Sequence, residues 1–404
     1  MNRIILIGNG FDIANGLETR YSDFIIWLWK KLNSKYNSYI IESKSECIIK
    51  GLVTYVPFTT PQAIDPIYLI PKNDVFINLT QTSQLCRIRF DNEFFKIITT
   101  NFKNKNWVDI EEDYFSMLKK CLIGKYAGGI EKLNKDFDII KEELAEYLNS
   151  ELEEKKNSKI CFQNIEQAFY ITDFSSLGKD MLKEEYFSEN EERKLLFDQY
   201  IKRLGFINNH IESYNLNINP NSVLFLNFNY TDLPTKILNI IRINNWQLDD
   251  WAKKPMDCIY IHGELKNQHN PMIFGYGDEL DEDHKIIEKR GGDFLNNIKT
   301  INYLKTGNYK KLLSFIESGY YQVFIFGHSC GFSDKTLLNT LFEHKHCASI
   351  KPFYHEWDDK ENIKHNNYDE IIKSIYRVFT DKSSMRDKVV DKTHCQPLAQ
   401  QNKQ

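Results

Sequence analysis

The chain has 404 residues, of which 42% are hydrophobic and 27% are charged, as is usual for a globular protein. Its formal net charge of −4 argues against a dedicated nucleic-acid binder, which would ordinarily be basic. No apolar run reaches the ~18 residues of a membrane helix, and the N-terminus lacks a signal-peptide pattern, so we expect a cytoplasmic protein without a membrane partner. The eight cysteines have no C-x-x-C spacing, which predicts reduced thiols and no zinc ribbon.

A strand is expected at the start of the chain, where the apolar run Ile4–Ile7 shows no polar alternation. Such a run is typical of a strand buried on both faces in a parallel sheet. A glycine-rich turn, residues 8–10, follows, and a helix is predicted directly after it. Backbone amides in such a turn, together with a helix N-terminus, can bind a phosphate. The third glycine of the dinucleotide-binding fingerprint is missing, because Ile13 occupies its place.

The middle of the chain is predicted to be mainly helical. A helix is expected over 21–35, and β-rich runs at 48–56 and 75–79 are interrupted by prolines. Apolar residues then recur at spacings of three and four within 107–122, 130–152 and 196–214. We therefore interpret residues 91–215 as an α-helical insertion, which serves either as a cover for a cleft or as a partner-binding element.

Strands and helices alternate in the last part of the chain. Strands are predicted at 222–226, 258–261, 271–274, 322–326 and 350–354, with helices at 231–243, 283–289, 309–318, 335–342 and 368–379. This alternation predicts an α/β protein with a Rossmann-like, doubly wound, mainly parallel sheet. Residues 1–90 and 216–380 would form this discontinuous core, 91–215 the insertion, and 381–404 a disordered tail.

Polar residues follow several of the predicted strands. In an open α/β sheet, ligands bind beyond the carboxyl ends of the strands, so these turns are expected to meet in one cleft. The candidate site residues are Gly8, Asn9, Gly10 and Asp12 after the first strand, Asn229 and His262 after the next ones, and Gly327 and Ser329 near the end.

Two of these residues are candidates for catalysis. His262 stands next to a glycine and could act as a base with a near-neutral pKa, or it could be a histidine hydrogen-bonded inside the core. Asn229 could orient a water or a ribose hydroxyl, or it could cap the helix that is expected near Thr231.

The motifs resemble those of the AbiH family of bacteriophage abortive-infection proteins. The likeness rests on GNGFD (8–12), TRYSDF (19–24), WVDIE (107–111), NFNYTD (227–232), IHG (261–263) and FGHSCGFSD (326–334), and it spans nearly the whole chain up to the tail. The resemblance implies a role in antiviral defence. It leaves open a phage-derived trigger and a homo-oligomer as partners.

The order of the motifs is also similar to that of the sirtuin-like NAD-binding fold. That resemblance implies that the turn at 8–10 holds the NAD diphosphate, that Asn229 lies beside the nicotinamide ribose and that His262 is the general base. Asp12 replaces a serine of that pattern, Thr231 stands where an aspartate would be expected, and the zinc ribbon of the deacetylating members is absent. The expected activity is therefore hydrolysis of the N-glycosidic bond of NAD, with NAD as substrate or ligand and no metal.

Other interpretations remain open. The chain could be a sensor that binds a nucleotide or a phage component without catalysis. The segment GHSCG (327–331) fits the G-x-S-x-G nucleophile elbow of a serine hydrolase, but only one strand is predicted after Ser329, and no acid and histidine follow in the required order. His344, His346 and Cys347 are of metal-binding type, but no further ligand has a suitable spacing, so a solvated loop is expected there.

Overall fold

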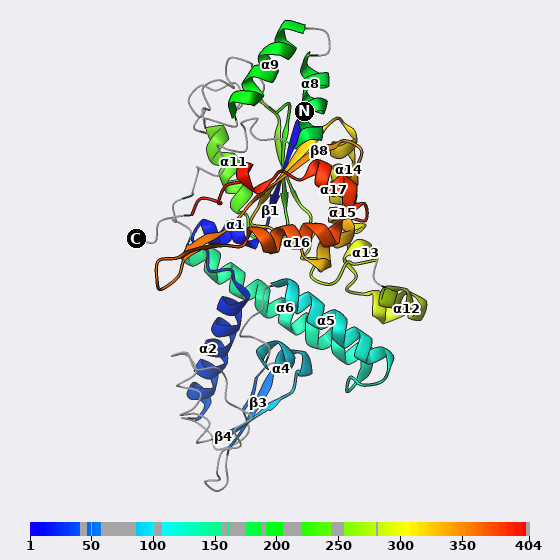
Figure 1. The fold of residues 1–404 in the computed structure, drawn as a ribbon. Coiled ribbons are helices and arrows are strands. Elements are labelled where there is room, and N and C mark those ends of the chain that lie inside the picture. The colour runs from blue at the N-terminus through cyan, green and yellow to red at the C-terminus, as the bar shows by residue number, and fades with distance from the viewer. Residues whose placement is uncertain are drawn as a thin grey trace. The chain divides into compact units, whose positions relative to one another are not determined.

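The computed structural model describes residues 1–400 with gaps at 41–46, 50, 58–85, 101–106, 156–159, 161–174, 188–190, 205–219, 244–253 and 280–281. The chain forms two compact units. The first, here called the sheet unit, comprises Met1–Leu17, Lys155–Ile273 and Lys299–Gln404. The second unit comprises Glu18–Glu154 and Phe274–Ile298 (Figure 1). The predicted run 75–79 and the end of the predicted helix 196–214 lie outside the described residues.

A five-stranded parallel sheet forms the centre of the sheet unit. Its strands are β1 (Asn2–Ile7), β5 (Val223–Asn227), β6 (Met256–Tyr260), β7 (Tyr321–Phe326) and β8 (Cys347–Phe353), in the spatial order β6-β5-β1-β7-β8. Along the chain, the strands are first added on one side of β1 and then on the other. The prediction of an α/β fold with a parallel sheet is therefore confirmed.

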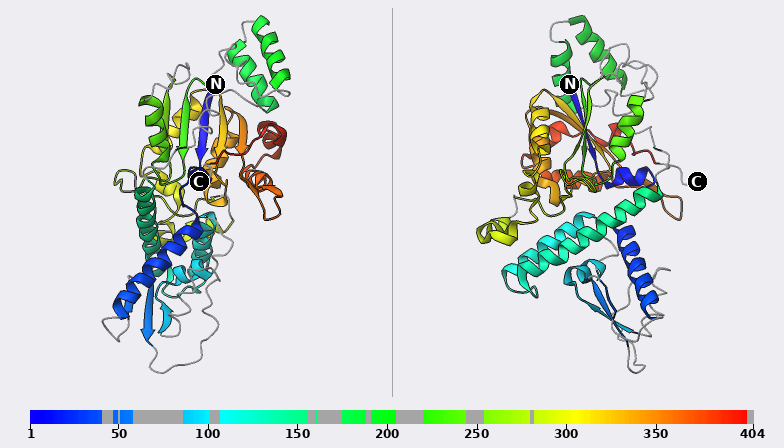
Figure 2. Two further views of the ribbon diagram at one scale, coloured as in Figure 1. Left: turned by 90° about the vertical axis from the view of Figure 1, so that its left-hand side faces the viewer. Right: turned by 180° about the vertical axis from the view of Figure 1, so that it is seen from behind.

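Helices lie on both sides of this sheet. The views in Figures 1 and 2 place α11 (Leu233–Ile243) on one side and α14 (Asn308–Glu317) on the other. On the α14 side, alternate residues of β1 and β7 pack with α14, α15 (Lys335–Glu343) and α16 (Tyr368–Val378) into one buried apolar cluster. The short α1 (Asn9–Ala14), α8 (Ser176–Phe187), α9 (Glu191–Leu204), α13 (Lys299–Tyr303) and the 3₁₀ turn η6 (Phe332–Asp334) belong to the same unit.

One predicted strand, 271–274, is wrong. The segment has no regular structure because it folds back over the end of β6. Gly263 makes the reversal possible with a φ of 82°, and Ile273 N donates to the carbonyl of His262 over 2.7 Å. Pro271 has no N–H for a sheet ladder, so this apolar run covers a strand end instead of joining the sheet.

The second unit contains α2 (Tyr21–Ile40), α4 (Glu93–Thr100), α5 (Trp107–Leu122), α6 (Gly129–Glu154), α12 (Glu282–Arg290) and the 3₁₀ turn η5 (Gly292–Leu295). It also has a small antiparallel sheet of β2 (Cys47–Ile49), β3 (Val53–Pro57) and β4 (Cys86–Phe90). Its limits differ from the predicted insertion 91–215, since it takes in 18–90 and 274–298 and ends at 154. Aromatic packing accounts for the distant segment, because the ring of Phe274 stacks on Phe137 with 5.1 Å between their centroids.

The C-terminal segment, for which we expected disorder, packs along β8. It contains α17 (Lys382–Lys388) and the 3₁₀ turn η7 (Lys392–His394), and it follows the hairpin of β9 (Glu356–Asp358) and β10 (Lys364–Asn366). Lys388 Nζ donates to the carbonyls of Phe342 and His344 over 3.0 and 2.9 Å. Lys388 thus caps the C-terminal end of α15 and fixes the position of a polar segment. The polar composition of this segment had suggested disorder.

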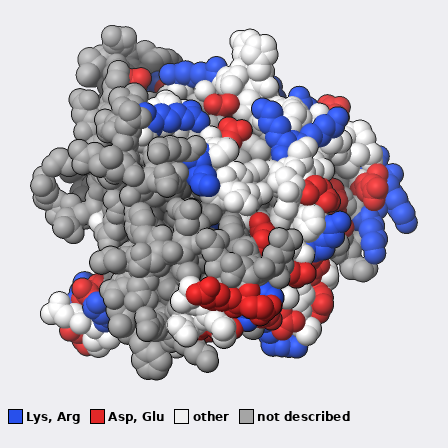
Figure 3. Space-filling model, turned by 90° about the horizontal axis from the view of Figure 1, so that it is seen from above, with Lys and Arg blue, Asp and Glu red and all other residues white. Residues whose placement is uncertain are grey.

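None of the described helices has both the length and the apolar composition that crossing a membrane requires. Figure 3 shows one face of the molecule, on which basic and acidic side chains are interspersed over the described residues.

Candidate active site

The turns that follow β1 and β7 pack directly against each other. Gly8 N donates to the carbonyl of Phe326 over 3.0 Å, and Gly10 N donates to that of Gly327 over 2.9 Å. Gly327 has a φ of 70°, and a Cβ there would lie 2.2 Å from Phe11 N. Only glycine allows this approach. The same bonds occupy the amides of Gly8 and Gly10, which we had predicted to meet a phosphate.

Asp12 lies buried beneath these turns. Its Oδ2 accepts a hydrogen bond of 2.8 Å from the hydroxyl of Thr231, which follows β5. Burial raises the pKa of Asp12 to about 7, although hydrogen bonds from Thr231 and Asn229 act in the opposite direction. Asn229 itself donates from Nδ2 to the carbonyl of Gly8 over 3.0 Å, so it joins the end of β5 to the β1 turn. It does not cap α11, which begins at Leu233.

A second buried carboxylate, that of Asp334, contacts three basic side chains. Lys299 Nζ lies 2.8 Å from its Oδ1, and His262 Nε2 lies 3.0 Å from the same oxygen. His328 Nε2 approaches the other oxygen, Oδ2, to 3.5 Å. Tyr303 adds its hydroxyl at 3.2 Å from His262 Nε2. These five side chains, here called the Asp334 cluster, are all at most 8% exposed.

The fold brings the cluster together from four segments of the sheet unit. His262 follows β6, and His328 lies in the turn after β7. Asp334 ends η6, while Lys299 begins α13. The cluster therefore lies at the carboxyl edge of the parallel sheet, where sequence analysis predicted a site.

The charge state of the cluster follows from its contacts. Burial alone would raise the pKa of Asp334, but the charges of Lys299 and His262 hold that pKa well below its ordinary value. Asp334 is therefore a carboxylate at neutral pH, paired with a lysine that is 1% exposed. This fixed ion pair sets the electrostatic surroundings of both histidines.

The contacts also define which imidazole nitrogen carries the proton. The Asp334 carboxylate can only accept, so His262 directs an Nε2–H toward it. His328 Nδ1 accepts from Cys330 N over 3.0 Å, so its proton is likewise on Nε2. The Nδ1 lone pair of His328 is engaged by the backbone. His262 is oriented through Nε2 by the Asp334 carboxylate, as the imidazole of a catalytic base is oriented by its acid.

Ser329 lies outside this cluster. The residue is exposed, and within the described part of the chain no histidine or carboxylate hydrogen-bonds to its hydroxyl. Besides Gly327, Cys330 of this turn has a left-handed backbone, with a φ of 53°, and burial raises the pKa of its thiol. The turn thus lacks the hydrogen-bonded base that activates a serine or a cysteine nucleophile.

The predicted site residues fall into two groups. The first consists of Gly8, Gly10, Asp12, Asn229 and Gly327, which the packed turns bring together, with Asn9 half-buried at the start of α1. His262 belongs to the second group, the Asp334 cluster, of which sequence reasoning missed the other members. Asp334 and His328 could have been found, since both stand in the motif FGHSCGFSD. Lys299 and Tyr303 carry no sequence signal, because only the tertiary fold brings their helix to the strand ends.

The fold and the cluster define an α/β protein with an acid–histidine–lysine site at the carboxyl edge of a parallel sheet. The chain belongs to the AbiH family, because the family model described as Bacteriophage abortive infection AbiH matches residues 4–357. The match runs from β1 to β9 and includes every motif on which the resemblance rested. No curated protein matches the chain significantly.

Proposed function

We propose that this protein defends bacteria against phage by abortive infection, and that it hydrolyses the N-glycosidic bond of NAD or a related nucleotide. Membership of the AbiH family supports the defence role. One observation carries the chemistry: His262 is held by an ionised Asp334 at the end of β6, in the arrangement of an oriented base.

The strand order supports a nucleotide as the ligand. The order β6-β5-β1-β7-β8 reverses direction between β1 and β7, which is the order expected of a Rossmann-like, doubly wound sheet. In such sheets the ligand binds outside the carboxyl ends of the strands at the reversal point. Here that point is formed by the turns 8–10 and 327–331, and the second turn contains His328 of the Asp334 cluster.

Three residues of the Asp334 cluster, together with Asn229, have a part in the proposed reaction. In its neutral form His262 accepts a proton from the attacking water or from a ribose hydroxyl, while Asp334 stabilises the resulting imidazolium. Lys299 keeps Asp334 ionised. Asn229 fixes the glycine turn and offers an amide to orient the ribose.

Two departures from the sirtuin-like pattern contact each other. Asp12 stands where that pattern has a serine and Thr231 where it has an aspartate, and their side chains share a hydrogen bond of 2.8 Å. The two departures from the pattern therefore lie side by side.

A second candidate function is a nucleotide sensor without catalysis. The observation in its favour is that His262 is buried and bonded to Asp334 and Tyr303, as a histidine with a structural role would be. A ligand would then be held at the strand ends without being cleaved.

The proposed activity is tested by incubating the purified full chain with NAD and measuring free nicotinamide by chromatography. We expect release by the wild type and by Ser329→Ala, and a rate about a hundred- to ten-thousand-fold lower for His262→Asn. His269→Asn, an exposed histidine seven residues further on, is the matched control and should retain the wild-type rate. Binding of NAD without nicotinamide release by the wild type would favour the sensor.

A further inference from the structure

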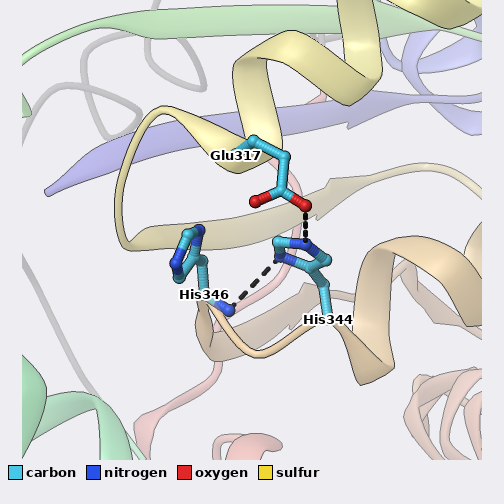
Figure 4. Close-up of side chains that lie close together, drawn as sticks. All are labelled: Glu317, His344 and His346. Carbon is cyan, nitrogen blue, oxygen red and sulfur yellow. Dashed lines mark hydrogen bonds and ion pairs between the residues drawn. The ribbon is translucent and has the colours of Figure 1, made fainter.

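A separate group of metal-binding side chains lies at the opposite, amino edge of the sheet. Glu317 is the last residue of α14, and His344 and His346 stand between α15 and β8. One potential ligand atom from each of the three lies within 4.8 Å of the other two. Figure 4 shows the Glu317 carboxylate directed toward the two imidazoles. We propose that these three residues bind a divalent transition-metal ion of the zinc class.

The ligand types select this class of ion. Two imidazoles and one carboxylate suit zinc, cobalt, nickel or copper, whereas magnesium and calcium prefer oxygen ligands throughout. From the sequence, His344, His346 and Cys347 were of metal-binding type, but a solvated loop without a metal was predicted there. The third ligand, Glu317, stands 27 residues before His344 and reaches it through the pairing of neighbouring strands.

The carboxylate is ionised and accessible. A hydrogen bond from His344 lowers the pKa of Glu317, whose Oε1 lies 3.1 Å from His344 Nε2. The Glu317 side chain is 58% exposed, so an ion can reach it from solvent. Lys345 Nζ, at 3.8 Å from the other Glu317 oxygen, competes with the ion for this charge.

The imidazoles are held by their surroundings. His346 Nδ1 donates to the carbonyl of Ile316 over 2.9 Å, which leaves the Nε2 lone pair for a metal, as backbone carbonyls do for histidine ligands in known metal sites. The ring of His344 stacks on Tyr321, with 6.1 Å between their centroids. Tyr320 packs edge-on against His346 at 5.6 Å.

Binding requires a rearrangement of the side chains. A tetrahedral zinc ion about 2.1 Å from each donor holds the donors about 3.4 Å apart, so atoms that lie within 4.8 Å of one another must close by up to about 1.4 Å. His344 must also transfer its proton from Nε2 to Nδ1. This transfer breaks the bond from His346 N to His344 Nδ1, which at 3.3 Å is the longest of the three polar contacts described for these imidazoles. The ion would then join the α14–β7 and α15–β8 turns across two adjacent strands.

The test uses the metal alone on the full chain. Chelator-treated protein is titrated with Co²⁺ and its visible spectrum recorded, and Zn²⁺ affinity is measured by competition with a chromogenic chelator. We expect one tight equivalent, an intense tetrahedral Co²⁺ spectrum, and at least a tenfold loss of affinity in His346→Ala and Glu317→Gln. Lys345→Gln should bind more tightly, because it removes the competing cation.

The matched control is His365→Ala, an exposed histidine that pairs with Asp359 over 2.8 Å. Circular dichroism checks that each variant is folded. Wild-type zinc affinity in both His346→Ala and Glu317→Gln would contradict the proposal. So would a weak, octahedral Co²⁺ spectrum of the wild type, or an equal loss of affinity in the control.

Discussion

Both edges of the parallel sheet carry histidines paired with a carboxylate, but the two groups differ in what they can do. At the carboxyl edge, His262 and His328 meet Asp334 in a buried cluster that contains its own cation, Lys299. At the amino edge, His344 meets Glu317 at the surface, 3.1 Å away. Burial is the main difference between them, because the Asp334 side chain is 6% exposed and that of Glu317 is 58% exposed.

This difference decides what each group can do. A buried carboxylate must be paired, and once paired it holds neighbouring imidazoles in one protonation pattern. An exposed carboxylate is stabilised by water and contributes little to folding, so its contacts can be replaced by a metal ion at little cost in stability. The carboxyl edge is therefore suited to proton transfer, and the amino edge to cation capture.

The largest expected effect is that of removing the buried charge. Asp334→Asn leaves Lys299 buried without its carboxylate and should lower the free energy of unfolding by about 3–5 kcal/mol. Hydrogen exchange of the β7 amides measures this locally. Asp198→Asn, which breaks the surface pair with Lys183, should cost less than about 1 kcal/mol. Equal costs would remove the distinction between buried and exposed carboxylates.

The packed turns give the next largest effect. Gly327→Ala combines a left-handed backbone with a clash against Phe11 N and should cost about 2–4 kcal/mol. Gly307→Ala is the control in the same unit, since a Cβ there meets no atom within 4 Å. Urea unfolding of the two variants compares them. A Gly327→Ala protein as stable as the control would show that the turns are not in close contact.

Asp12 and Asp334 should respond to pH in opposite directions. The pKa of Asp12 is about 7 in the folded protein and near 3.8 in the unfolded chain, so its contribution to stability falls as pH rises from about 4 to 7. The pKa of Asp334 is lowered on folding, so its contribution is lost as pH falls below that of an ordinary aspartate.

Asp12→Asn isolates the first of these terms. The wild type should lose about 2–3 kcal/mol relative to this variant between pH 5 and pH 8, measured by urea unfolding at each pH. The amide keeps an acceptor for Thr231, so the hydrogen bond survives. Parallel stability curves for the two proteins would mean that Asp12 is ionised throughout this range.

The smallest effect is expected at the amino edge without metal. Glu317→Gln removes the negative charge from an exposed contact with His344 and should leave the thermal midpoint in chelator unchanged. Added zinc should then raise the midpoint of the wild type but not that of the variant, because the ion binds the folded site. A large drop in the chelator-treated variant would instead assign Glu317 a structural role.

The sequence predicted the sheet better than the site. A strand that is buried on both faces needs an unbroken apolar run such as Ile4–Ile7, and such a run can be recognised in the sequence. The segment 271–274 is also apolar and was wrongly predicted to be a strand. It covers the end of β6 instead, because the chain reverses at Gly263. Helical periodicity in 107–122 and 130–152 predicted α5 and α6, but not that the distant segments α12 and η5 pack with them.

Tertiary contacts explain what was missed at the site. Each strand-end turn was recognisable, so Asn229 and His262 could be proposed from the motifs. The partners of His262 come from a helix and a 3₁₀ turn distant in the chain, Lys299 in α13 and Asp334 in η6. The glycine turn was predicted as a phosphate cradle, whereas its amides bond to the β7 turn, a pairing that no local pattern encodes.

The most direct test of the central claim, that the carboxyl edge carries out the chemistry of defence, is a phage-protection assay with His262→Asn. Cells that produce the wild type, His262→Asn or the control His269→Asn at equal levels are infected, and their survival and NAD content are measured. We predict that His262→Asn protein is folded, binds NAD in calorimetric titration and fails to protect cells, while the control protects them and depletes NAD. Protection by folded His262→Asn equal to that of the wild type would contradict the catalytic account and leave the nucleotide sensor as the explanation.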